Sequence, residues 1–154
     1  MTRKTIGNEM IRNLEPSDLD TVLDIWLDAS LKAHDFIDPA YWRSQVENMR
    51  NLYLPASETC VIERETRVVG FYSLLDSQLA ALFVTPDCQG QGLGKQLIAH
   101  AKTQRAALTL AVYKNNQPSC QFYLSQGFVV THEQTDEQTG QPEYLMSTVG
   151  THPQ

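Results

Sequence analysis

Apolar residues recur at two different spacings along the chain, and the spacings divide it into helices and strands. Apolar residues that lie three or four positions apart are typical of amphipathic helices. Trp26 belongs to one such stripe and is expected to be buried. The predicted helices cover about 19–33, 39–54, 93–105 and 118–126. Short runs with period-two alternation or continuous apolar character predict strands instead. The predicted strands cover 8–14, 59–63, 68–75, 78–84, 108–113, 128–135 and 143–148.

The order of these elements predicts a single α+β domain over residues 1–154, with its core at 8–149. The short turn Asp76-Ser77 makes the three middle strands an antiparallel meander. A whole helix separates 78–84 from 108–113, so these two strands should run parallel.

Polar residues and glycine mark the ends of several predicted helices. Ser17 is the expected N-cap of the first helix, with Asp20 in the capping-box position. Asp38 before Pro39 should cap the second helix. Gly127 should end the fourth helix in a left-handed conformation.

Composition narrows the class of protein. A chain of 154 residues that is 42% hydrophobic and 19% charged suits one globular domain. We expect a cytoplasmic protein without a membrane partner, because no apolar run approaches roughly 18 residues and the basic N-terminus has no apolar segment after it. The cysteines and histidines show no metal-binding spacing, so we expect no metal site.

Three glycines within five residues follow the strand at 78–84 and precede a helix. Gly90, Gly92 and Gly94 leave backbone N–H groups free at a helix N-terminus, which is a favourable site for phosphate. A P-loop is excluded because Gln96, not Ser or Thr, follows Lys95. A dinucleotide fingerprint is excluded because Lys95 stands where the third glycine should be.

Two blocks of sequence resemble a known family. Gln89-x-x-Gly92-x-Gly94 resembles the Q/R-x-x-G-x-G/A signature of the GNAT superfamily, the acetyl-CoA-dependent N-acetyltransferases. Further on, Asn116, Tyr123 seven residues later, and Gly127-Phe128 resemble the second block of that family. The resemblance covers residues 8–149, and its specific part is 82–128.

The resemblance implies a mixed sheet of about seven strands, flanked by four helices, whose fourth and fifth strands splay apart. Acetyl-CoA would be the co-substrate, with its pantetheine arm bound in the gap and its diphosphate at the glycine loop. The residues that would bind it are Leu82, Phe83, Val84, Gln89, Gly90, Gln91, Gly92, Leu93, Gly94, Lys95 and Asn116.

The resemblance also implies that Tyr123 is the general acid that protonates the departing thiolate, and that the Val84 amide polarises the carbonyl. Family members that acetylate protein N-termini often carry a glutamate five residues before the asparagine, but Ala111 stands there. The general base therefore stays open among Tyr72, Asp76, His34 and a chain of water molecules.

The acceptor of the acetyl group is expected to be a primary amine. His34, Phe36, Trp42 and Tyr72 are candidates for contact with it, and the acidic residues Asp35, Glu133, Asp136 and Glu137 are candidates for attracting its charge. A protein lysine, a polyamine, an aminoglycoside and a non-catalytic acyl-CoA-binding role all stay open, as does a homodimer. We expect no nucleic-acid partner, because the chain has only 12 Lys and Arg residues against 18 Asp and Glu residues.

Overall fold

The structure is a computed structural model that describes residues 9–149. The expected tail at 151–154 and the basic N-terminus lie outside the described residues. The strands are β1 (Glu9–Asn13), β2 (Glu58–Arg64), β3 (Arg67–Leu75), β4 (Gln78–Val84), β5 (Thr109–Tyr113), β6 (Val129–Thr135) and β7 (Pro142–Ser147). The helices and helical turns are η1 (Pro16–Asp18), α1 (Leu19–Ala33), α2 (Pro39–Ser44), α3 (Val46–Asn48), η2 (Met49–Tyr53), α4 (Leu54–Ala56), η3 (Pro86–Cys88), α5 (Leu93–Gln104) and α6 (Gln117–Ser125).

The seven strands form one mixed sheet in the order β1-β2-β3-β4-β5-β7-β6. Strands β1 to β4 are an antiparallel meander, and β5, β7 and β6 form a second antiparallel group. Strands β4 and β5 run parallel but share only the pair Gln78 and Thr109. The predicted α+β fold and the splay between the fourth and fifth strands are therefore confirmed.

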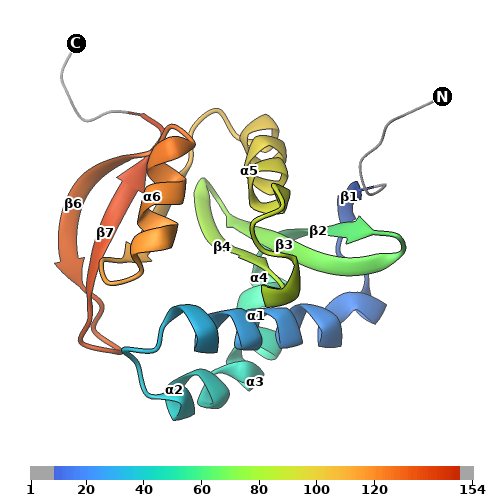
Figure 1. Cartoon of the computed structure of the whole chain (residues 1–154), viewed down its shortest axis with the longest axis horizontal. Coiled ribbons are helices and arrows are strands. Elements are labelled where there is room, and N and C mark those ends of the chain that lie inside the picture. Colours follow the sequence, from blue (N-terminus) through green and yellow to red (C-terminus); the bar gives the residue numbers. More distant parts are fainter. Residues whose placement is uncertain (1–8, 150–154) are drawn as a thin grey trace.

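Helices cover both faces of the sheet (Figure 1). Helix α1 packs on β3 and β4 from one side, and α5 packs on the same strands from the other. Each side has its own buried cluster, one around Trp26 and Phe71 and one around Leu97 and Tyr72. Because β3 is covered on both faces, its neighbouring residues Phe71 and Tyr72 are both buried.

The start of the first helical segment differs from the prediction. Glu15, not Ser17, occupies the N-cap, and its N–H donates to Asp18 Oδ2 at 2.8 Å. Asp18 also accepts from Arg12 Nη1 at 2.7 Å, and this contact lowers the pKa of the Asp18 carboxyl. The capping box lies two residues earlier than predicted because Arg12 on β1 fixes Asp18.

The second predicted helix is divided into short pieces. It begins at Asp38, whose side chain accepts from Ala40 N at 2.9 Å as predicted for an N-cap. A π-helical turn, η2, then precedes Pro55, with the Leu54 N–H donating to Met49 O. Proline has no N–H and its ring crowds the preceding turn, which explains why regular α-helix is lost there.

Candidate active site

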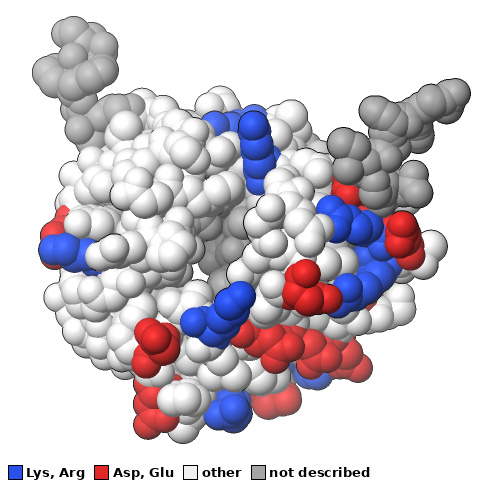
Figure 2. All heavy atoms as spheres, in the orientation of Figure 1, with Lys and Arg blue, Asp and Glu red and all other residues white. Residues whose placement is uncertain are grey.

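A cavity of about 1010 Å³ lies where β4 and β5 part. Figure 2 shows the surface hollowed at this place, between the half of the sheet that carries α5 and the half that carries α6. Leu82, Phe83 and Val84 line the cavity from β4, and residues 110–113 line it from β5. Beyond the pair at Gln78 the two strands do not bond to each other, so their facing backbone groups are open to a ligand.

The glycine loop forms one end of the cavity. Gly90 and Gly92 have φ angles of +78° and +83°, a left-handed region that favours glycine, and a Cβ at either would meet no atom within 4 Å. Gly92 is the N-cap of α5, so the open space lies at the positive end of a helix dipole. Free N–H groups, space and favourable charge fit the diphosphate of acetyl-CoA.

The side chains of the loop are divided between the cavity and the surface around it. Gln89 lines the cavity and donates from Nε2 to Val84 O at 3.1 Å. Leu93, Gly94 and Lys95 also line it. Gln91 does not, because its side chain turns to Arg64.

Gly94 has a role that its position in the motif did not indicate. A Cβ at Gly94 would lie 3.3 Å from Phe122 Cζ. The missing side chain therefore allows α5 and α6 to approach each other closely beside the cavity.

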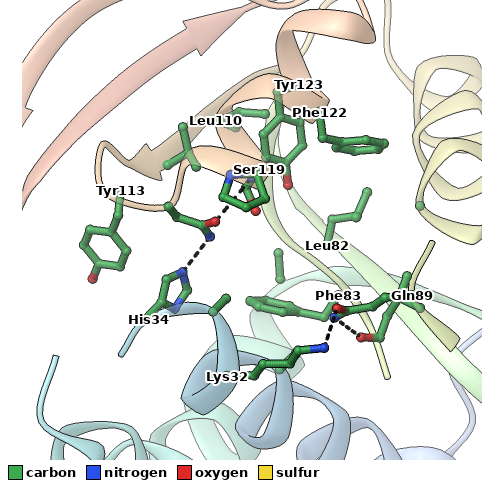
Figure 3. A pocket seen from close by; sticks show the side chains of 18 of the residues that line it. Lys32, His34, Leu82, Phe83, Gln89, Leu110, Tyr113, Ser119, Phe122 and Tyr123 are labelled. Carbon is green, nitrogen blue, oxygen red and sulfur yellow. Dashed lines mark hydrogen bonds between the residues drawn. The ribbon is translucent and has the colours of Figure 1, made fainter. Parts of the chain in front are cut away.

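Tyr123 reaches the cavity from α6. The residue is 9% exposed, and its ring makes edge contacts with Phe122 and Phe128. Burial raises the pKa of the phenol well above its usual value of 10. Tyr123 is therefore neutral and keeps a proton that it can donate inside the cavity (Figure 3).

His34, the C-cap of α1, and Asn116, the N-cap of α6, form a buried pair on the cavity wall. Figure 3 shows the His34 side chain and the bond that it makes. Asn116 Oδ1 accepts from Ser119 N at 3.3 Å, so its Nδ2 must be the atom that lies 3.0 Å from His34 Nε2. An amide nitrogen only donates, and His34 Nε2 must therefore accept and Nδ1 must hold the proton. Asn116 lines the cavity as expected, but both ends of its amide already have protein partners.

The pair also limits what His34 can do. Burial lowers the pKa of the imidazole to about 4, and its Nδ1 is a buried donor without a partner among the described residues. A neutral ring whose accepting nitrogen is already occupied is a poor general base. His34 is instead part of an aromatic wall, with its ring stacked on Trp42 at 5.1 Å and in edge contact with Tyr113 at 5.1 Å.

Like Gln91, three other expected site residues lie outside this cavity. The ring of Phe36 packs against His34 and Tyr113 but does not line the cavity. The Tyr72 side chain points to the face that α5 covers, where its hydroxyl lies 2.7 Å from His100 Nδ1. Asp76 is a turn residue at φ +54°, and its carbonyl accepts from Arg105 Nε at 2.7 Å.

The acidic candidates are also placed differently. Asp136 accepts from the Tyr113 hydroxyl at 2.5 Å and from two groups of its own loop, so it organises the β6–β7 connection. Glu133 pairs with Lys114 at 3.3 Å. Asp35 lines the cavity, whereas Glu137 does not.

Sequence reasoning missed two charged residues that line the cavity. Lys32 on α1 lies beside the glycine loop, with Nζ 3.4 Å from Gln89 Oε1 (Figure 3). Glu143 on β7 lines the opposite half of the sheet. Neither belongs to a local motif, and Lys32 meets its partner from 57 positions away, so no pattern along the chain indicated either residue.

Two further findings concern the described part of the chain, residues 9–149. None of its helices combines the length and the apolar character that crossing a membrane requires. Its His, Cys, Asp and Glu side chains form no group of three that could hold a metal ion.

Comparison with known proteins agrees with this geometry. The sequence model of the family described as acetyltransferase (GNAT) domain matches residues 55–130. The chain is 34% identical over 139 residues to the peptidyl-lysine N-acetyltransferase YiaC of Escherichia coli K12, covering 90% of this chain and 95% of YiaC. It is 32% identical over 140 residues to the peptidyl-lysine N-acetyltransferase YjaB of Salmonella typhimurium LT2, covering 90% and 96%.

A solved structure shows the same architecture. The solution structure of apo YjaB from Escherichia coli superimposes with a TM-score of 0.81 at 29% identity, and the match covers 93% of this chain and 99% of YjaB. With the cavity between the splayed strands, these similarities establish that the chain belongs to the GNAT acetyltransferases and is an N-acetyltransferase that transfers the acetyl group of acetyl-CoA to a primary amine.

Proposed function

We propose that the acceptor is the side-chain amine of a lysine in a protein or peptide, and that Tyr123 is the general acid of the transfer. The observation that carries the proposal is the buried, neutral phenol of Tyr123 on the wall of a cavity whose other wall is the unpaired edge of β4. Acetyl-CoA supplies the thioester. The protein supplies its placement and the movement of protons.

The β4 edge and the glycine loop hold the cofactor in this proposal. Backbone groups of Leu82, Phe83 and Val84 bind the amides of the pantetheine arm in place of the missing strand contacts. The N–H groups around Gly92 bind the diphosphate, and Lys95 adds a positive charge. Asn116 contributes through the position of α6, since its side chain is bonded to His34 and Ser119.

Tyr123 acts on the leaving group. Burial destabilises a thiolate as it destabilises a phenolate, so a sulfur that leaves inside the cavity needs a proton or a strong hydrogen bond. The Tyr123 hydroxyl holds that proton at the cavity wall. It therefore lowers the free energy of the step in which the carbon–sulfur bond breaks.

One half of the cavity, lined by Trp42, Ala81, Ala111 and Tyr113, suits a lysine, and we call it the acceptor half. Ala81 and Ala111 leave room for an aliphatic stem, and the rings of Trp42 and Tyr113 offer an aromatic surface to an ammonium group. The relatives YiaC and YjaB are named as peptidyl-lysine acetyltransferases. Because such acceptors and acetyl-CoA occur in the cytoplasm, the proposal places the enzyme there.

Tyr123→Phe tests the general acid. We expect kcat to fall by roughly 10²- to 10⁴-fold, the usual contribution of general acid catalysis, while the Kd for acetyl-CoA stays within about twofold. Tyr53→Phe, at an exposed tyrosine on η2, is the matched control and should behave as wild type. Equal kinetics for Tyr123→Phe and wild type would remove the acid role.

A panel of acceptors tests the substrate class. Lysine peptides, polyamines and aminoglycosides are compared by the release of free thiol from acetyl-CoA. We expect kcat/KM to be highest for the peptides. A higher value for either small amine would replace the lysine assignment with that class.

A further inference from the structure

The acceptor half of the cavity needs a group that can take a proton from an ammonium ion. A primary amine is protonated at neutral pH and is not a nucleophile until that proton is removed. Ala111 on β5 is exposed and lines the cavity, and its methyl group cannot accept a proton. Among the described residues that line the cavity, two carry carboxylates, Asp35 and Glu143.

The register of the sheet places Glu143 diagonally next to Ala111. Tyr113 on β5 pairs with Glu143 on β7, and Ala111 pairs with Leu145. Paired residues point to the same face, and diagonal neighbours such as Ala111 and Glu143 lie about 7–8 Å apart. A glutamate side chain can cover much of that distance, and the methyl group of Ala111 leaves the space free.

The Glu143 carboxylate bonds to the neighbouring strand β6. Gln134 Nε2 on β6 donates to Glu143 Oε2 at 2.6 Å, and no bond to Oε1 occurs among the described residues. Asp35 is in a different situation, because it lies exposed in the loop between α1 and α2 without such a bond. Because β6 lies on the opposite side of β7 from β5, the Gln134 bond turns the Glu143 carboxylate away from Ala111, and a rotation of the side chain brings it to the acceptor. Glu143 stands on a strand of the sheet, whereas Asp35 stands on a loop. A base on a strand is positioned more precisely, which favours Glu143.

The other titratable groups of this face are occupied or turned away. His34 Nε2 accepts from Asn116, and the Tyr113 hydroxyl donates to Asp136. Tyr72 lies on the opposite face of the sheet. His132 on β6 shares the face of Glu143, two residues from Gln134, but it does not line the cavity.

We propose that Glu143 is the general base that deprotonates the acceptor amine. One N–H bond of the ammonium breaks, and an O–H bond forms on the Glu143 carboxylate. The electron pair left on nitrogen forms the bond to the thioester carbonyl carbon, and the carbon–sulfur bond breaks. A second N–H bond breaks as the neutral amide forms, and the proton it releases replaces the one that the departing thiolate takes at the cavity wall. Glu143 then releases its proton to water.

This proposal rests on the lysine acceptor proposed above and is independent of the role given to Tyr123; inactivity of wild type on the lysine peptide would refute the acceptor, not Glu143. Glu143→Gln keeps the size of the side chain and removes the base. Glu133→Gln, one residue pair away on the other face of the β6–β7 hairpin, removes the same charge and is the matched control. Both variants are compared with wild type across pH, with one lysine peptide and with one acceptor amine of low pKa that is already neutral at pH 7.

With the lysine peptide at pH 7, we expect Glu143→Gln to lower kcat/KM by roughly 100-fold, as for the loss of a general base. The defect should shrink below about tenfold near pH 10, where solvent alone leaves about three-tenths of the amine neutral. It should also be below about tenfold for the low-pKa amine at pH 7, while Glu133→Gln matches wild type throughout. A defect of equal size at both pH values and for both amines, or wild-type rates in Glu143→Gln, would overturn the proposal.

Discussion

The buried His34 makes stability depend on pH in a way that can be calculated. Its pKa is about 4 in the folded protein, lowered by burial, against about 6.5 in an unfolded chain. Both states hold neutral histidine above pH 6.5, so the full stability is present there. As pH falls from 6.5 to 4 the unfolded state takes up a proton first, and stability is lost through this window.

The size of the loss follows from the two pKa values. At pH 5 the unfolded histidine is almost fully protonated, whereas the folded one is about nine-tenths neutral. Between pH 6.5 and pH 5, about 1.5 pH units, the unfolding free energy falls by about 1.4 kcal/mol per unit. The loss at pH 5 is therefore about 2 kcal/mol. His34→Gln removes the titration while its side-chain oxygen can still accept from Asn116 Nδ2.

Urea unfolding at pH 7.5 and pH 5 measures the effect. Wild type should lose about 2 kcal/mol more than His34→Gln between the two pH values, because all other titrating groups are common to both proteins. His132→Gln, which alters an exposed histidine on β6, should lose as much as wild type. Equal losses in wild type and His34→Gln would show that His34 is not held neutral by burial.

Two other substitutions test the glycines. Gly92→Glu should raise the Kd for coenzyme A at least 100-fold, because it puts a side chain and a negative charge into the space at the start of α5; undiminished affinity by calorimetry would refute the diphosphate site. Gly70→Ala should lower the unfolding free energy by about 1–3 kcal/mol, since its Cβ would lie 2.9 Å from Phe83 O. A thermal midpoint equal to that of wild type would contradict this close contact.

The parts of the site that follow from backbone conformation could be predicted from the sequence. The loop around Gly92 needs a left-handed residue before a helix, and the glycine spacing states that requirement directly. The same holds for Gly127, which has the predicted positive φ angle of 93° at the end of α6. Short-range rules of this kind do not depend on what packs against the segment.

The parts that depend on contacts between distant segments could not be predicted. Tyr72 and Phe71 are both fully buried, so the alternation along β3 does not tell which of them faces the cavity. The bond between His34 and Asn116 joins residues 82 positions apart. Only the three-dimensional arrangement shows that His34 meets Asn116. It also shows that Tyr72 bonds to His100 and does not face the cavity.

The single residue pair between β4 and β5 has a consequence beyond catalysis. It divides the sheet into two blocks, β1–β4 and β5–β7, that are joined along the backbone ladder at one point. A ligand that bonds to both strand edges would complete the ladder and stabilise the whole molecule, by about 2.7 kcal/mol at a concentration 100 times its Kd. The lifetime of the enzyme against proteases in the cell would then follow the supply of acetyl-CoA, so that scarcity would reduce both the reaction and the amount of enzyme.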